Sequence, residues 1–426
     1  MEFRASRSGP LRGVAAIPGD KSCSHRALIL GALAKGETRI SGLLEADDVA
    51  ATARAVAAFG AGVERLDTGE WLVRGADWQS PPEPVDCGNS GTAARLLIGA
   101  AANFPLTATF VGDASLSARP MARVVAPLTR MGARFEGNDH LPITLHGGQL
   151  GGIDFVNEPA SAQVKSAILL AGLRAQGAVI VREPVPSRDH TEIMLREFGC
   201  DVGFEGDAIV LGEQQRPTGR DISIAADPSS AAFPLTATAL IPGSSVEVRD
   251  LLVNPLRTGL FEALEEMGAE VELSDERLQS GEVVANLGIG QAPLRAIEIG
   301  AERIPAMVDE VPLLAVAAAY ADGESVIHGL AELRHKESDR LGAILTGLIA
   351  CGVTALIKDD TLHIFGRGRV RGGAKVLAQG DHRIAMAFLV LGLAADEPVT
   401  VDSGEMIATS FPGFVDTMRA LGADII

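Results

Sequence analysis

The chain has 426 residues, which is enough for two or three domains with large cores. Its apolar (47%) and charged (22%) fractions are those of an ordinary globular protein, whereas its net charge of −18 argues against a nucleic-acid partner, which requires a basic surface. Small anions are not excluded, because a local cluster of Arg and Lys can bind them, and the acidic excess also fits a purely solvating role.

The cysteines predict reduced thiols rather than a disulfide framework or a zinc site, because no two of them form a CxxC pair. They are Cys23, Cys87, Cys200 and Cys351. No secretory signal opens the sequence, and no apolar run has the length of a membrane span. We therefore expect a soluble, cytoplasmic protein with neither a membrane nor a nucleic acid as partner.

A recurring phrase sets the architecture: AAFGAGV, TRMGARF, REFGCDV, EEMGAEV, IACGVTA and RALGADI return about every seventy residues. Each copy predicts an amphipathic helix, a glycine in the left-handed conformation that closes it, and a short strand. The six glycines are Gly60, Gly132, Gly199, Gly268, Gly352 and Gly422.

A second phrase, such as ALILGALAKGETRI or LLAVAAAYADGESVI, also occurs six times, out of phase with the first. It predicts a helix that is apolar all round, and therefore buried, followed by a turn and a strand. Three copies per domain predict two similar α/β domains, residues 18–227 and residues 1–17 plus 228–426. Two crossing strands, near 17–20 and 226–227, would form a hinge with the substrate between the lobes, and closure would exclude water.

Polar motifs precede the apolar helices of the first domain. In PGDKSCSHRALIL (18–30), Lys21, Ser22 and Arg26 stand at a helix N-terminus, where backbone N–H groups favour anions; a serine-capped helix with solvated basic residues is the alternative. In CGNSGTAARLL (87–97), the turn with Asn89 and Gly91 brings N–H groups close to an oxyanion, although glycine-rich turns are common.

Three further motifs of this domain follow the same rule. GDASLSARPMARV (112–124) carries Arg119, and PASAQVKSAILLAGL (159–173) presents Ser161, Ala162 and Gln163 at a helix start. SRDHTEIML (187–195) places Arg188 before another helix.

The second domain repeats this placement. MVDEVPLLAVAAA carries Asp309 just before a buried helix, where a simple N-cap is the alternative role. In LRHKESDRLGAI, the spacing predicts Lys336 and Arg340 on one helical face, beside Glu337; a solvated charged helix is the alternative.

The last motif, DHRIAMAFLVLGL, presents His382 and Arg383 ahead of an apolar helix. Because charged residues gather at the same edge of several repeats, the functional interpretation becomes stronger than any single motif allows.

DKSCSHR, GNSGTAARLL, GDASLSARPM, SAQVKSAILLAG, KESDRL and DHRIAMA together resemble the 5-enolpyruvylshikimate-3-phosphate synthases over essentially the whole chain. SAQVKSA and SRDHTE are similar to the bacterial class II subgroup. The resemblance implies an inverse α/β fold of two domains, each of three βαβαββ units. It also implies transfer of the enolpyruvyl group of phosphoenolpyruvate to the 5-hydroxyl of shikimate 3-phosphate, by addition and elimination, in aromatic amino acid biosynthesis. No metal or organic cofactor is expected, and we expect a monomer.

The resemblance also implies roles for individual residues. Shikimate 3-phosphate would be bound by Lys21, Ser22, Arg26, Ser161, Ala162, Gln163, Arg188, Asp309 and Lys336. Phosphoenolpyruvate would be bound by Lys21, Asn89, Gly91, Arg119, Gln163, Arg340, His382 and Arg383. Asp309, Glu337 and Lys21 would move protons, and the division of this work among them stays open.

One departure and one detail bear on the site. Many members carry a lysine where IATSFP has Thr409, which puts that contact in doubt. In the family that the chain resembles, a glycine at the place of Gly91 leaves room for the inhibitor glyphosate, so the resemblance implies sensitivity despite the class II motifs.

Three other classes of protein fit the sequence less well. The UDP-N-acetylglucosamine enolpyruvyl transferases have a reactive cysteine shortly before the Arg-Pro step, which GDASLSARP lacks. RNA 3′-phosphate cyclases share the repeated unit, but no basic nucleotide-binding surface is visible. A non-catalytic, anion-binding repeat scaffold would not need so many charged residues at one edge.

Overall fold

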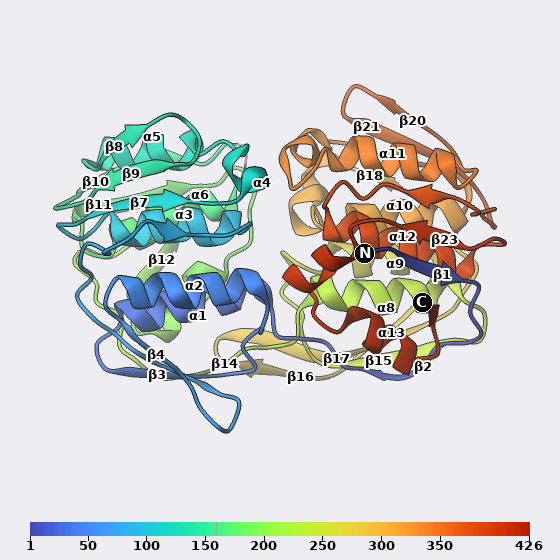
Figure 1. Cartoon of the computed structure of the whole chain (residues 1–426), viewed down its shortest axis with the longest axis horizontal. Helices are drawn as coiled ribbons and strands as arrows, with labels where there is room; N and C mark the ends of the chain where they lie inside the picture. The colour runs from blue at the N-terminus through green and yellow to red at the C-terminus, as the bar shows by residue number, and fades with distance from the viewer. Residues whose placement is uncertain (159) are drawn as a thin grey trace. The chain divides into compact units, whose positions relative to one another are not determined.

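The computed structural model describes residues 1–158 and 160–426 and shows two compact units (Figure 1). The first unit consists of Gly19–Ile224 and Gln279–Glu282; the second consists of Met1–Pro18, Ala225–Leu278 and Val283–Ile426. The expected boundaries stood at 17/18 and 227/228. The grouping of Gln279–Glu282, the turn between two strands of the second unit, with the first unit was not predicted.

The described residues form six four-stranded sheets, three in each unit. In the first unit the strand orders are β14-β3-β5-β4, β6-β7-β9-β8 and β10-β11-β13-β12. Each begins with a parallel pair and continues with antiparallel pairs, as a repeated unit requires. These strands are β3 (Glu37–Ser41), β4 (Gly62–Arg65), β5 (Trp71–Arg74), β6 (Val85–Asp86), β7 (Thr107–Val111), β8 (Arg134–Gly137), β9 (Ile143–His146), β10 (Gly151–Val156), β11 (Gln176–Arg182), β12 (Val202–Glu205), β13 (Ala208–Leu211) and β14 (Asp221–Ser223).

The sheets of the second unit are β16-β17-β15-β2, β18-β19-β21-β20 and β22-β23-β1-β24. The N-terminal segment supplies two of their strands: β1 pairs with β23 and β24, and β2 pairs in parallel with β15. The strands are β1 (Phe3–Ser6), β2 (Arg12–Ala15), β15 (Ser245–Leu252), β16 (Glu270–Gln279), β17 (Glu282–Gly290), β18 (Glu298–Ile299), β19 (Asp322–Ile327), β20 (Thr354–Lys358), β21 (Thr361–Arg367), β22 (Lys375–Val376), β23 (Val399–Val401) and β24 (Asp424–Ile425).

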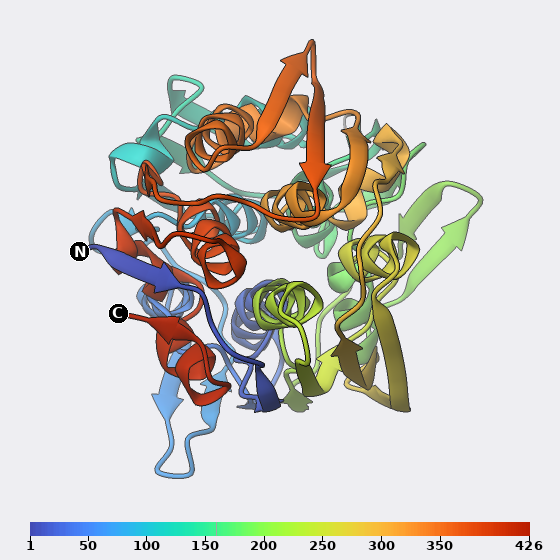
Figure 2. The same ribbon diagram turned by 90° about the vertical axis from the view of Figure 1, so that its right-hand side faces the viewer.

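Three inner helices occupy the core of each unit: α1 (Lys21–Leu33), α3 (Gly91–Ala101) and α6 (Ala162–Gly172) in the first, and α8 (Pro228–Leu240), α10 (Val311–Tyr320) and α12 (His382–Ala394) in the second. Every residue of α10 is buried, which explains a sequence that is apolar all round. Figure 2 shows the yellow-green α8, orange α10 and red α12 nearly end-on, grouped inside the sheets of their unit. The second phrase of the sequence is therefore the inner helix, as predicted.

Outer helices cover the sheets: α2 (Asp47–Ala58), α5 (Ala122–Met131), α7 (His190–Glu197), α9 (Gly259–Met267), α11 (Arg340–Ala350) and α13 (Phe414–Ala420). Shorter helical turns are α4 (Ala114–Ser117), η1 (Ala301–Ala306), η2 (Ala331–His335) and η3 (Gly404–Thr409). All six glycines of the first phrase have φ between 81° and 113°, so the left-handed closure predicted from the sequence is confirmed.

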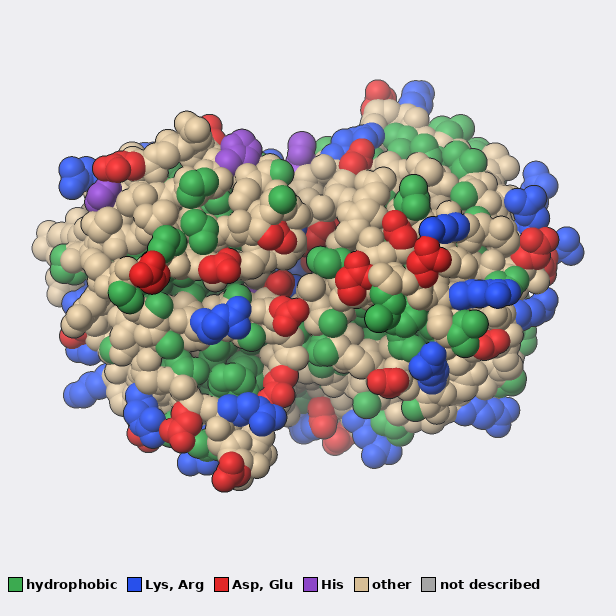
Figure 3. Space-filling model, viewed as in Figure 1, with side chains coloured by type: hydrophobic (Ala, Val, Ile, Leu, Met, Phe, Trp, Pro, Cys, Tyr) green, Lys and Arg blue, Asp and Glu red, His purple; other side chains and the backbone are tan. Residues whose placement is uncertain are grey.

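Acidic and basic side chains are interspersed on the face shown in Figure 3. Within the described part of the chain, no helix combines the length and the apolar character that crossing a membrane requires.

Candidate active site

The N-terminal ends of the three inner helices of the first unit meet. Ser90, the N-cap of α3, lies 3.4 Å from the Nε2 atom of His25 on α1, and Gln163 on α6 donates to Thr92 on α3 at 2.9 Å. Three positive helix ends therefore converge on one region, which favours anionic ligands.

On α1 the predicted residues differ in their surroundings. Lys21 forms an ion pair with Asp48 and its side chain is 20% exposed, and Ser22 is half-buried. Arg26 is only 3% exposed and donates to Thr191 (2.6 Å), Ser166 (2.8 Å) and the carbonyl of Ser22 (2.9 Å). Its guanidinium is thus largely engaged inside the protein, which the sequence did not indicate.

The glycine-rich turn holds Arg119 in place. Arg119 donates to Asn89 Oδ1 at 2.9 Å and to Ser115 at 3.2 Å, while the Asn89 amide donates to Asp113 at 2.6 Å. Gly91 begins α3, and a Cβ atom there would stand 3.3 Å from Arg119 Nη1. The structure therefore brings Asn89, Gly91 and Arg119 together, as expected from two separate motifs.

Arg95, which was not among the predicted site residues, links three motifs of this unit. Its guanidinium donates to Gln163 Oε1 (2.6 Å), to the carbonyl of Gly91 (3.5 Å) and to the carbonyl of Pro120 (3.2 Å). Its place four residues after Gly91, on the same helical face, was the available signal.

Ser161 is the N-cap of α6, and its hydroxyl accepts from Val164 N–H at 3.5 Å. Ala162 and Gln163 form the first turn and are half-buried. The motif that contains them begins at residue 159, which lies outside the described residues. Arg188 is half-buried and precedes α7; burial first, and to a smaller degree the charge of Arg188, lower the pKa of Arg26.

In the second unit the inner-helix ends also meet. Glu310, the N-cap residue of α10, is 3% exposed and accepts from Ser229 on α8 and from Arg383 on α12, the latter at 3.5 Å. Arg383 also donates to the carbonyl of Asp309 at 3.3 Å. His382, next to Arg383, is 5% exposed at the first position of α12. Glu310, like Arg95, was not among the predicted site residues.

Three carboxylates surround Arg340, whose side chain is 1% exposed. Its Nε donates to Asp381 at 2.7 Å, its Nη1 to Asp309 at 3.0 Å and its Nη2 to Glu337. Burial lowers the pKa of Arg340, but Asp381, Glu337 and Asp309 outweigh burial and raise the pKa above its usual value. Asp381, fully buried, was missed, although its position just before His382 marks an N-cap.

Two expectations about motifs of the second unit were wrong. Lys336 and Arg340 do not share a helical face, because Asp339 caps α11 by accepting from Gly342 N–H at 3.1 Å, so the helix begins only at Arg340. Lys336 instead follows η2, with its ammonium 3.8 Å from Asp309. The alternative of Asp309 as a helix N-cap is also wrong, since Glu310 holds that position.

Thr409, the position where many relatives have lysine, ends η3 and donates to the carbonyl of Met406 at 2.7 Å. Its hydroxyl is therefore used within its own helical turn.

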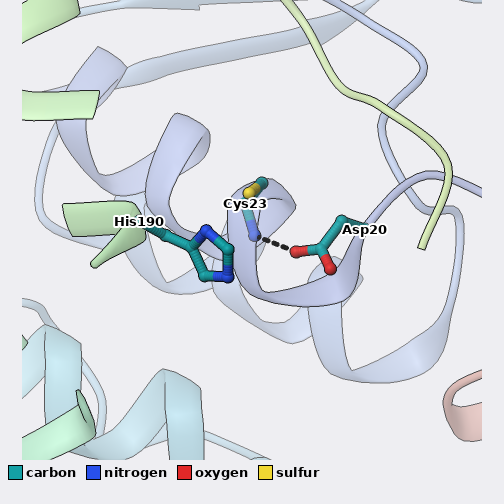
Figure 4. A group of neighbouring side chains, drawn as sticks. All are labelled: Asp20, Cys23 and His190. Atoms are coloured by element: carbon teal, nitrogen blue, oxygen red, sulfur yellow. Dashed lines mark hydrogen bonds between the residues drawn. The ribbon is translucent and has the colours of Figure 1, made fainter. Parts of the chain in front are cut away.

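Figure 4 shows a buried group not expected from the sequence: Asp20, Cys23 and His190, whose potential ligand atoms lie within 4.8 Å of one another. Asp20 already accepts the N–H of Cys23 at 2.7 Å as the N-cap of α1, and His190 Nδ1 lies 2.6 Å from Glu282. The positive end of α1 and the charge of Lys21 both disfavour a cation here. We therefore assign no metal to this group.

Comparison with known proteins agrees with this architecture. The EPSP synthase (3-phosphoshikimate 1-carboxyvinyltransferase) family model matches residues 6–418. Curated 3-phosphoshikimate 1-carboxyvinyltransferases from Caulobacter vibrioides and Phenylobacterium zucineum are 51% and 52% identical to this chain. Each match covers 99% of this chain, and 98% and 95% of the respective relative. The solved EPSP synthase of Acinetobacter baumannii superposes with a TM-score of 0.89 at 39% identity, over 100% of this chain and 99% of that one.

The enolpyruvyl transferase NikO from Streptomyces tendae, 20% identical with a TM-score of 0.77 over 100% of this chain and 98% of that one, shares the fold. The architecture is thus that of the enolpyruvyl transferases. Within this class, the chain belongs to the EPSP synthase family.

Proposed function

We propose that this chain transfers the carboxyvinyl group of phosphoenolpyruvate to the 5-hydroxyl of shikimate 3-phosphate and releases phosphate, a step of aromatic amino acid biosynthesis. The observation that carries the proposal is 51% identity with a curated 3-phosphoshikimate 1-carboxyvinyltransferase over 99% of the chain. Both substrates carry a phosphate and a carboxylate. The converging helix ends and basic side chains of each unit suit such anions.

Several of the residues assigned to shikimate 3-phosphate are reachable and carry hydrogen-bond donors. In the first unit, Ser161 and Gln163 stand in the first turn of α6, and Lys21 and Ser22 begin α1. A phosphate at these helix ends gains both the backbone N–H groups and the helix dipoles. The full assignment is Lys21, Ser22, Arg26, Ser161, Ala162, Gln163, Arg188, Asp309 and Lys336.

Phosphoenolpyruvate is assigned to the guanidinium groups, because a fork of N–H donors matches phosphate and carboxylate oxygens. Arg119 and Arg383 are 8% and 12% exposed, so neither residue is wholly enclosed by its unit. Arg340 is buried among three carboxylates. We assign it a contribution to binding through the electrostatic attraction of its positive charge for the anion, with a hydrogen bond from any N–H group that faces the anion. The other residues assigned to this substrate are Lys21, Asn89, Gly91, Gln163 and His382.

The addition step needs an acid for the methylene carbon of phosphoenolpyruvate and a base for the 5-hydroxyl of the acceptor. The methyl group formed by this protonation then loses a proton as phosphate is eliminated from the tetrahedral intermediate. Asp309 and Glu337 share Arg340 and remain 15% and 21% exposed, so both carboxylates are held in place and reachable. We assign proton transfer to Asp309, Glu337 and Lys21, each worth roughly 10²–10⁴ in rate.

A cysteine-dependent enolpyruvyl transfer is the competing chemistry, and the thiol nearest in sequence to the Arg-Pro step does not support it. Cys87 is fully buried, and burial, aided by Asp86, raises the pKa of its thiol to about 12. A thiol with this pKa is a poor nucleophile at neutral pH. All four cysteines are buried thiols outside any disulfide, which fits a reducing compartment, and we propose a monomeric, cytoplasmic enzyme.

The direct test mixes the protein with shikimate 3-phosphate and phosphoenolpyruvate and follows inorganic phosphate. Three controls accompany it: omission of either substrate, shikimate without its phosphate, and UDP-N-acetylglucosamine as the acceptor. Phosphate release that requires shikimate 3-phosphate supports the proposal. Release only with UDP-N-acetylglucosamine, or with neither acceptor, refutes it. The molar mass of the protein, measured by light scattering after size-exclusion chromatography at the assay concentration, tests whether it is a monomer.

A further inference from the structure

A charged cluster that none of the assignments above uses lies inside the first unit. Lys165 on α6 is 1% exposed, and its ammonium stands 2.6 Å from Glu183 and 2.7 Å from Glu192. Burial lowers the pKa of Lys165, but Glu192 and Glu183 outweigh it and raise the pKa overall. Replacing a buried ion pair by apolar residues is often neutral or stabilising, so stability alone does not explain this cluster.

Glu183 connects two loops that carry assigned substrate-binding residues. One oxygen accepts from the Asn157 amide at 2.7 Å and from the Ser187 hydroxyl at 2.6 Å; the other accepts from Ser187 N–H at 3.2 Å. The same Asn157 amide donates to the carbonyl of Ser161 at 3.1 Å. Lys165 completes the link by donating to the carbonyl of Ser187 at 3.2 Å.

The two loops follow different strands of the same sheet. Asn157 and Ser161 come after β10, whereas Ser187 and Arg188 come after β11. Without a cross-connection, each loop would be fixed only by its own strand and helix. Glu183 is the point where both loops and α6 are joined by hydrogen bonds.

We propose that Lys165 and Glu183 are a positioning pair that fixes Ser161 and Arg188 in the arrangement that binds the phosphate of shikimate 3-phosphate. The proposal rests on the function proposed above. With exposures of 1% and 5%, the two side chains act through the loops and not by touching substrate. Misplacement of a binding group by about 1 Å costs up to roughly 10²-fold in efficiency, which is the scale at stake.

Glu183→Gln tests this with little change of shape. The new amide keeps one oxygen to accept from Asn157 and the Ser187 hydroxyl, but it loses the acceptor used by Lys165 and Ser187 N–H. Glu192→Gln is the matched control, because it removes the other carboxylate from the same ammonium, at 1% exposure, on α7 instead of the loops.

The readouts are the dissociation constants of shikimate 3-phosphate and shikimate by calorimetry, the kcat, both KM values and the Tm. We expect Glu183→Gln to weaken shikimate 3-phosphate binding by roughly 10- to 100-fold, while shikimate binding and kcat change by less than about threefold. Glu192→Gln should leave shikimate 3-phosphate binding within about threefold, at a comparable change in Tm. Ser187→Ala, which removes only one hydrogen bond, should shift binding in the same direction by less.

If Glu183→Gln and Glu192→Gln weakened shikimate 3-phosphate binding equally, the loss would reflect general destabilisation of the unit, and this result would overturn the proposal. So would unchanged shikimate 3-phosphate binding in Glu183→Gln, or, if that variant does not fold, in Ser187→Ala. Wild-type protein that binds shikimate 3-phosphate tightly but releases no phosphate would refute the proposed function alone, since the binding series still tests the pair. Wild-type protein that does not bind shikimate 3-phosphate would refute both.

Discussion

Replacing Arg340 by Met is expected to be among the most damaging single changes in the second unit. The guanidinium donates to three carboxylates at once, with Nε 2.7 Å from Asp381 and Nη1 3.0 Å from Asp309. Asp381 is fully buried, so its charge cannot be compensated by water when the guanidinium is removed. Removing one partner of a buried ion pair costs about 3–5 kcal/mol.

Two further variants show which property matters. Arg340→Lys keeps the charge but offers a single ammonium in place of a planar fork, so we expect a smaller loss, about 1–3 kcal/mol. Arg334→Met is the matched control: Arg334 pairs with Asp339 at 3.0 Å, but both side chains are at least 40% exposed. An exposed pair of this kind is worth about 0–1 kcal/mol.

Urea unfolding followed by circular dichroism gives the free energy of unfolding, and phosphate release gives kcat for the same samples. Because Asp309 and Glu337 are held by Arg340, kcat should fall in both Arg340 variants. The reasoning fails if Arg340→Met unfolds within about 1 kcal/mol of Arg334→Met, since the three contacts would then contribute nothing beyond a surface pair.

Three other changes are expected to have distinct effects. Asp309→Asn should keep substrate binding within about tenfold and lower kcat by roughly 10²–10⁴; a fall of less than about fivefold would remove Asp309 as a proton-transfer group. Gly91→Ala should raise the inhibition constant of glyphosate by at least about tenfold, with a smaller change in the KM of phosphoenolpyruvate, because the added methyl group, 3.3 Å from Arg119 Nη1, takes up space that the bulkier ligand needs first. Millimolar resistance of the wild type would show that another residue controls the inhibitor. Burial first, then Lys21 and Arg26, hold the pKa of His25 well below its usual 6.5, so below pH 6.5 the imidazole is protonated in the unfolded state but stays neutral in the folded state. The free energy of unfolding should therefore fall below pH 6.5 by up to about 1.4 kcal/mol per pH unit. His25→Gln should flatten this dependence in urea titrations at pH 5.5 to 7.5, and an unchanged slope would contradict the assignment.

The repeated architecture was predictable because its signals are local. A glycine that closes a helix, as at Gly132 and Gly268, is readable from a few residues, and both adopt the left-handed conformation. The inner helices are equally readable, since burial on all sides requires an apolar residue at every position, as in α10.

The pairing of side chains was not predictable, because the partners come from different repeats. Arg95 meets Gln163, and Arg340 meets Asp381, only after the sheets and helices have packed. The one geometric inference from spacing, that Lys336 and Arg340 share a helical face, was wrong because a local cap at Asp339 outweighs periodicity.

The repeat nevertheless explains why residues from distant motifs meet. Each inner helix begins at the same point of its repeat, so three N-termini fall together in a unit, as the His25–Ser90 and Gln163–Thr92 contacts show. Any charged residue placed just before an inner helix is then brought to that region without a specific signal of its own. The connectors that hold these residues, such as Glu183, are buried and carry no such mark in the sequence. They become recognisable only when the hydrogen bonds between segments distant in sequence are known, so identifying such positions requires the structure.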